Sequence, residues 1–132
     1  MLGLLSVLSV VSVLSVFSGC EAGSGAARIS DAWMSADEEG AERVATYAQD
    51  AIFYAHVELT DAPADTNLKA SWVAVEVDDA DPGLIIDEVE TATSSGPTFF
   101  TLTNEGPWPL GTYRVELYVG DELLKSVEFD VR

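Results

Sequence analysis

The chain has 132 residues, of which 23 are acidic and 6 are basic, so its formal net charge is −17. Binding of a phosphate backbone needs clustered basic side chains, and the two basic residues closest in sequence are Lys125 and Arg132, which argues against nucleic acid as a partner. Without its first 19 residues the chain keeps 113 of its 132 residues, which fits one domain with one core.

The strong acidity needs an explanation of its own. Repulsion between many carboxylates loosens a small fold at low ionic strength, but in molar salt the Debye length shrinks to about 3 Å. Only two lysines are present, Lys69 and Lys125. A surface on which aspartate and glutamate replace lysine resembles that of proteins from halophilic archaea; the alternative is an ordinary acidic exported domain.

The N-terminal segment has the pattern of an export signal. Residues 2–17 are all apolar, serine or glycine, and the run closes with Phe17-Ser18-Gly19-Cys20. A large apolar residue three places before a cysteine, followed by two small residues, resembles the lipobox of bacterial and archaeal lipoproteins. This resemblance implies a signal peptide over residues 1–19 and a lipid on Cys20. The chain departs from the usual pattern in having phenylalanine instead of leucine and no basic residue before the run.

An uncleaved membrane helix is the alternative, because residues 2–19 are uncharged and about 18 residues are just enough to span a bilayer. Both interpretations place the rest of the chain on the external face of the cell membrane. Cys20 is the only cysteine, so it has no disulfide partner, and we assign it as a lipid acceptor rather than a nucleophile or metal ligand. Residues 20–27, rich in Gly, Ala and Ser, are predicted to be a flexible tether before a domain at 28–132.

Beyond the tether, the chain predicts β-strands separated by turns, because apolar residues alternate and aromatic and β-branched residues are frequent. The predicted strands lie at 28–34, 44–47, 52–59, 68–77, 84–91, 97–104 and 112–119, with a last strand that contains Val127, Phe129 and Val131. The acidic segment 37–42 is predicted to be a solvated loop or one helical turn.

Two strands have informative patterns. In 52–59, Phe53, Ala55, Val57 and Leu59 share one face, while Tyr54, His56 and Glu58 share the other, which predicts one buried and one wet face. In 68–77, Leu68, Ala70, Trp72 and Ala74 share one face, while Val73, Val75 and Val77 share the other. Apolar residues on both faces predict a central strand, with a bulge as one way to accommodate them.

About seven antiparallel strands, a tryptophan on a central strand (Trp72) and a tyrosine entering the penultimate strand (Tyr113) resemble an immunoglobulin-like β-sandwich. The run Trp108-Pro109-Leu110-Gly111-Thr112-Tyr113-Arg114-Val115-Glu116 is similar to an ending found in bacterial and archaeal secreted proteins, before a final hairpin. With the leader and the acidity, the chain resembles lipobox-containing exported proteins of halophilic archaea with such a domain. The resemblance of the domain covers 51–132 and implies a fold, not an activity.

Few residues suggest chemistry. His56 is the only histidine, so a Ser-His-Asp triad would have to be built around it and a two-histidine metal centre is excluded. We expect it to be a surface imidazole among carboxylates. No phosphate-binding loop is present. The sequence therefore predicts a protein that is not an enzyme and needs no cofactor.

Two features are candidates for binding. Asp78, Asp79 and Asp81, with the acidic residues of 87–90 downstream, offer the hard oxygen ligands that calcium prefers, although they lack the spacing of an EF-hand; a solvated loop is the alternative. Trp108 lies between two prolines and either covers the open end of the sandwich or contacts a partner protein.

The sequence thus predicts a lipid-anchored, extracytoplasmic, non-catalytic binding or assembly module at the cell surface. The alternative is a lipoprotein that binds calcium or a small solute through the acidic loop 78–81.

Overall fold

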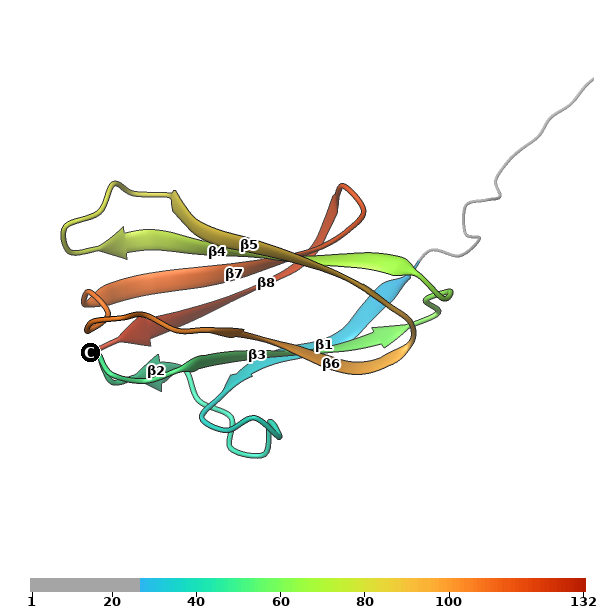
Figure 1. Ribbon diagram of the computed structural model, residues 1–132, viewed down its shortest axis with the longest axis horizontal. Helices are drawn as coiled ribbons and strands as arrows, with labels where there is room; N and C mark the ends of the chain where they lie inside the picture. The colour runs from blue at the N-terminus through green and yellow to red at the C-terminus, as the bar shows by residue number, and fades with distance from the viewer. Residues whose placement is uncertain (1–26) are drawn as a thin grey trace, which may run out of the picture.

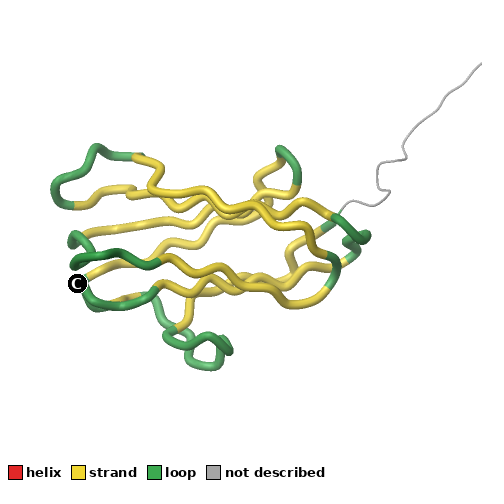
Figure 2. Tube along the Cα trace, in the orientation of Figure 1, coloured by secondary structure: helices red, strands yellow, loops and turns green. Residues whose placement is uncertain are grey.

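A computed structural model describes residues 27–132, which form eight strands joined by loops; Figure 2 shows no helix in this part of the chain. The predicted signal peptide, Cys20 and all but the last residue of the predicted tether lie outside the described residues. The strands are β1 (Arg28–Ser35), β2 (Thr46–Tyr47), β3 (Phe53–Thr60), β4 (Thr66–Val77), β5 (Leu84–Thr93), β6 (Gly96–Leu102), β7 (Gly111–Val119) and β8 (Glu122–Val131). Residues 27–132 include no helix that is long and apolar enough to cross a membrane.

The strands form two sheets that pack face to face (Figure 1). The smaller sheet has three strands in the order β1-β3-β6, and the larger has five in the order β2-β8-β7-β4-β5. All pairs are antiparallel except the short β2, which runs parallel to β8. The predicted all-β sandwich is confirmed, with eight strands in place of about seven.

The core lies between the sheets and is built from the predicted alternation. In β3, Phe53, Ala55, Val57 and Leu59 are all at most 2% exposed. The ring of Phe53 contacts aromatic rings from β4, β7 and β8. Apolar area removed from water is the main stabilising contribution to such a fold, so the fold depends on this face.

The central strand β4 contains the predicted irregularity, which alters which residues face inward. Its pairing with β7 shifts register between Ala74 and Glu76, and its pairing with β5 shifts between Trp72 and Val73. A bulge places two residues opposite one and so changes the alternation beyond it. The prediction that Val77 faces away from Ala74 is therefore wrong, because Val77 packs against the core and lines the same cavity as Ala74.

The two sheets differ in width, and this leaves one side of the sandwich partly open. β5 and β6 are the edge strands on that side, and Figure 1 shows them meeting at the short turn at 94–95 and diverging toward the opposite end. Inward-facing side chains near the start of β5 therefore have no strand of the smaller sheet directly opposite them. This opening is where the candidate site lies.

Candidate functional site

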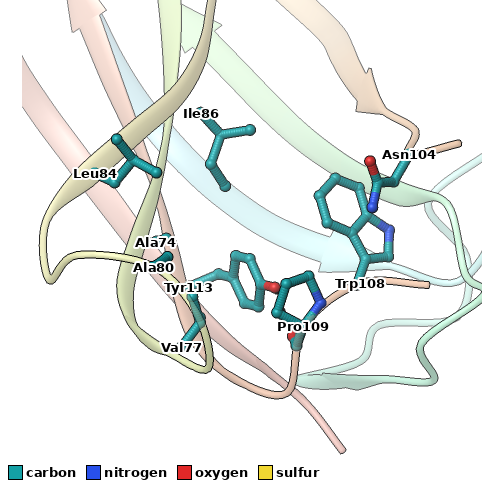
Figure 3. Close-up of a pocket in the computed structure, with 9 residues that line it drawn as sticks. All are labelled: Ala74, Val77, Ala80, Leu84, Ile86, Asn104, Trp108, Pro109 and Tyr113. Carbon is teal, nitrogen blue, oxygen red and sulfur yellow. Dashed lines mark hydrogen bonds between the residues drawn. The ribbon is translucent and has the colours of Figure 1, made fainter. Parts of the chain in front are cut away.

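A cavity of about 220 Å³ opens at the diverging end of β5 and β6. Four parts of the chain build it: β4 and the loop after it, the start of β5, the loop 103–110 and the start of β7. It is lined by Ala74, Val77, Ala80, Leu84, Ile86, Asn104, Trp108, Pro109 and Tyr113. Figure 3 shows Leu84 and Ile86 on one side and Trp108 and Asn104 facing them from the other. A mostly apolar lining with few polar groups is typical of a binding pocket.

Trp108 forms one wall, and its position is fixed by several contacts. Its indole Nε1 donates a hydrogen bond of 2.9 Å to the carbonyl of Ala51, and its ring stacks on Phe53 with centroids 4.3 Å apart. Its amide donates to the carbonyl of Gln49 at 2.7 Å, and the side-chain amide of Gln49 donates back to the carbonyl of Trp108 at 2.9 Å. With only 4% of its surface exposed, Trp108 covers the end of the core. A partner would reach its ring only through the cavity.

Tyr113 forms the floor next to Trp108. Its hydroxyl donates a hydrogen bond of 2.6 Å to the carbonyl of Pro109, four residues earlier, so the corner between the loop and β7 is closed by this bond. Burial, and secondarily the negative charge of Asp78, raises the pKa of Tyr113 to about 12. The phenol is therefore a fixed, neutral hydrogen-bond donor at ordinary pH and is unsuited to proton transfer.

The outer rim is an exposed apolar row on β5. Leu84, Ile85, Ile86 and Val89 are 48%, 55%, 37% and 36% exposed, respectively. Leu84 and Ile86 line the cavity, whereas Ile85 pairs with Val73 and is not part of the lining. Sequence reasoning predicted the strand but missed the site. The one available signal was the run of three large apolar residues immediately after a turn.

The loop between β4 and β5 brings acidic residues to the same end of the molecule. Asp78, Asp79 and Asp81 all lie in exposed positions of this loop, and Asp79 has a positive φ of 62°. Within residues 27–132, no group of three or more histidine, cysteine, aspartate or glutamate side chains is arranged so that it could hold a metal ion. A calcium site in this loop stays the alternative to a solvated loop.

The expectation for His56 is wrong: only 7% of its surface is exposed. Its ring stacks on Trp33 and Phe99, at centroid distances of 5.3 and 5.6 Å, and its Nε2 lies 3.3 Å from the carbonyl oxygen of Asp37. The cause is the acidic loop after β1, which folds over the outer face of β3 and brings Gly40 against the imidazole. Alternation along β3 predicts the sheet face correctly but cannot show that a loop covers it.

The carboxylate of Asp37 holds that loop together. It accepts hydrogen bonds from the amides of Ala41 and Glu42 at 3.1 and 3.0 Å. The bond from the Glu42 amide is the main reason why the pKa of Asp37 lies below its ordinary value. His56 contacts a backbone carbonyl through Nε2, not the hydroxyl that a nucleophile–base pair requires. The contacts of His56 are therefore those of a buried residue that stabilises the fold.

Comparison with known proteins supports the fold. No protein-family model matches the sequence, and no curated protein matches it. Among solved structures, the chain is similar to an immunoglobulin-like protein from Pseudomonas aeruginosa, with 21% identity over 83% of this chain and 100% of that one and a TM-score of 0.58. It is also similar to part of a β-glucosidase from Listeria innocua, with 14% identity, a TM-score of 0.51, and coverage of 80% of this chain but 15% of the enzyme. The immunoglobulin-like sandwich predicted from sequence is confirmed; at these identities the likeness concerns the fold alone.

Proposed function

We propose that this protein is a non-catalytic binding module, exported and held on the external face of the cell membrane through Cys20. The observation that supports binding is the apolar row on β5 next to the cavity at the open side of the sandwich. Large side chains such as Leu84 and Ile86 cost free energy when they are left in water on an edge strand, and exposed apolar surface of this kind marks interaction sites.

The chemistry of the cavity favours binding over catalysis. General acid–base catalysis needs a group whose pKa lies near the working pH and which reaches the substrate. Of the residues that line the cavity, only Tyr113 can titrate, and its pKa is raised to about 12 while its proton is committed to Pro109. The lining therefore offers shape and apolar contact rather than a proton donor or acceptor.

The proposed lipid anchor would place this binding site close to the membrane surface. A lipid on Cys20 would hold the domain within a short tether of the membrane and raise the local concentration of partners there. The acidic composition, with a net charge of −17, is consistent with a salt-rich exterior of the kind in which halophilic archaea live.

The anchor is tested by expressing the full chain and a Cys20→Ser variant in a halophilic archaeal host. We expect the parent to lose its leader and to carry a lipid on an N-terminal Cys20, and the variant to carry no lipid and to keep its leader. If the parent itself keeps its leader and carries no lipid, the lipoprotein assignment is wrong and the leader is an uncleaved anchor.

Binding is tested on intact cells by photocrosslinking. Leu84→Cys and Leu123→Cys place a thiol at two positions that are 48% and 49% exposed, the first beside the cavity and the second at the start of β8. Both are labelled with a benzophenone maleimide, which a lipid-modified Cys20 does not consume. We expect light to give a discrete adduct from position 84 alone. Equal adducts from both positions, or none, would contradict a binding site at the open side.

A further inference from the structure

We infer that the partner contributes an extended, positively charged segment that adds as a strand beside β6 and inserts an apolar side chain into the cavity. This inference rests on the proposed binding function and specifies its partner. Three observations support it: the free edge of β6, the apolar side chains on the inner side of β5, and the charges around the opening.

The free edge provides the backbone pairing. β6 is the last strand of the smaller sheet, so in the described chain the peptide groups along its outer edge have no strand partner. An exposed edge of this kind is a template onto which an extended peptide adds by main-chain hydrogen bonds. Pro97 lacks an N–H and limits such pairing at the start of β6, but the remaining residues, 98–102, contain no proline. Pairing is thereby directed to the end of β6 where the cavity opens.

The difference in width between the sheets provides the apolar contact. Val89 pairs with the inward-facing Ala70 and therefore lies on the inner face of β5, which places it with Leu84 and Ile86. These three side chains remain 36–48% exposed because the smaller sheet ends at β6. A strand added beside β6 would become the fourth strand of that sheet and lie opposite β5. Alternate side chains of that strand would then face the inner side of β5 and the cavity.

The charge around the opening determines which sign of charge the partner segment must carry. The two loops that flank the cavity, 78–83 and 103–110, contain Asp78, Asp79, Asp81 and Glu105 and no lysine or arginine. Adjoining them on β5, Asp87 pairs with the inward-facing Trp72 and therefore also lies on the inner face. A basic segment forms ion pairs with such a rim on contact, and in dilute buffer, where screening is weak, the same charges also steer its approach. A second copy of this chain, with its net charge of −17, has no cluster of basic residues to pair with this rim.

The probe is a fluorescently labelled, end-capped heptapeptide in which lysine alternates with leucine, titrated by anisotropy against the full chain in non-ionic detergent. Two matched peptides replace every lysine by glutamate or every leucine by serine. Two more carry N-methyl groups on the odd or on the even residues, because an added strand turns alternate amides toward its neighbour. Leu84→Lys is compared with Leu123→Lys, which adds the same charge at an equally exposed leucine away from the cavity.

We expect the lysine–leucine peptide to bind, the glutamate and serine peptides to bind at least about tenfold more weakly, and just one of the two N-methylated peptides to lose affinity. We expect Leu84→Lys to weaken binding at least about tenfold and Leu123→Lys to leave it nearly unchanged. Equal effects of the two substitutions, equal binding of the serine peptide, or equal binding of all N-methylated forms would each overturn the inference. Absence of peptide binding together with a discrete crosslink from position 84 would reject this partner class while leaving the binding function standing.

Discussion

The indole of Trp108 stacks on the ring of Phe53, with centroids 4.3 Å apart and planes inclined by 18°. This contact joins the loop 103–110 to the centre of the core, because Phe53, which belongs to the smaller sheet, is fully buried and touches aromatic rings of the larger sheet. The same indole is a wall of the cavity. The candidate site and the core therefore share a residue, and a substitution there tests both.

Trp108→Ala is expected to lower the free energy of unfolding by about 3–5 kcal/mol, because it removes a large buried side chain and leaves a cavity. It also removes the hydrogen bond to the carbonyl of Ala51. Trp108→Phe is the control, since it keeps a stacked ring and should cost less. Denaturant unfolding followed by far-ultraviolet circular dichroism measures both. A loss below about 1 kcal/mol for the alanine variant would mean that Trp108 does not cover the core.

The sequence predicted those features that depend on local pattern. The alternation in β3 identifies Phe53 and Val57 as core residues, and they are 0% and 1% exposed. The same alternation assigned His56 to a wet face, and the structure contradicts this because a loop more than ten residues earlier in the chain covers the imidazole. The alternation of apolar and polar residues within a strand does not depend on whether a distant loop covers its outer face, so it cannot predict such coverage.

Gly40 provides a test of this covered histidine. Its φ is +78°, and a Cβ there would lie 2.8 Å from Cε1 of His56, whereas Gly83, at φ +79°, has nothing within 4 Å of such a Cβ. Gly83→Ala should therefore cost only the conformational penalty of about 1 kcal/mol. Gly40→Ala should cost more and should also shift the imidazole resonances of His56 in the proton spectrum. Equal losses of stability with an unchanged imidazole would show that the loop does not pack on the ring.

The cavity lay beyond sequence reasoning for a different reason. Leu84 and Ile86 are ordinary strand residues by pattern, and they become a rim only because the smaller sheet stops at β6. Val77 lines the cavity because of a bulge whose position depends on pairing with β7. Sheet width and register are long-range properties, so the composition of any one strand does not reveal them.

Two buried tyrosines predict how stability depends on alkaline pH. Burial raises the pKa of both Tyr47 and Tyr113 to about 12, against an ordinary value of 10. Between these values the unfolded chain loses phenolic protons that the folded chain retains, so stability is fully present below pH 10 and is lost as the pH rises toward 12. Denaturant midpoints measured from pH 8 to 12 should fall over that window.

Tyr113→Phe should lower stability at neutral pH by about 0.5–1.5 kcal/mol, because it removes the hydrogen bond to Pro109, and it should make the alkaline decline shallower. Absorbance at alkaline pH reports the ionisation directly. If all four tyrosines of the chain ionised together near pH 10, the proposed environment of Tyr47 and Tyr113 would be wrong.

The effects of salt and of calcium on stability distinguish a solvated acidic loop from a calcium site at 78–81. A net charge of −17 on a chain of this length produces self-repulsion that molar salt screens, so molar potassium chloride should raise the melting temperature of the full chain well above its value in dilute buffer. A solvated loop predicts that calcium at millimolar concentration does no more than equimolar magnesium. A large effect of calcium alone, abolished by Asp79→Asn and Asp81→Asn, would instead make the loop a ligand site. The melting temperature of Leu84→Lys, measured in the same two buffers, tests whether the acidic residues around the cavity repel one another. A new positive charge at position 84 should offset some of that repulsion in dilute buffer, but not in molar salt, where the charges are screened.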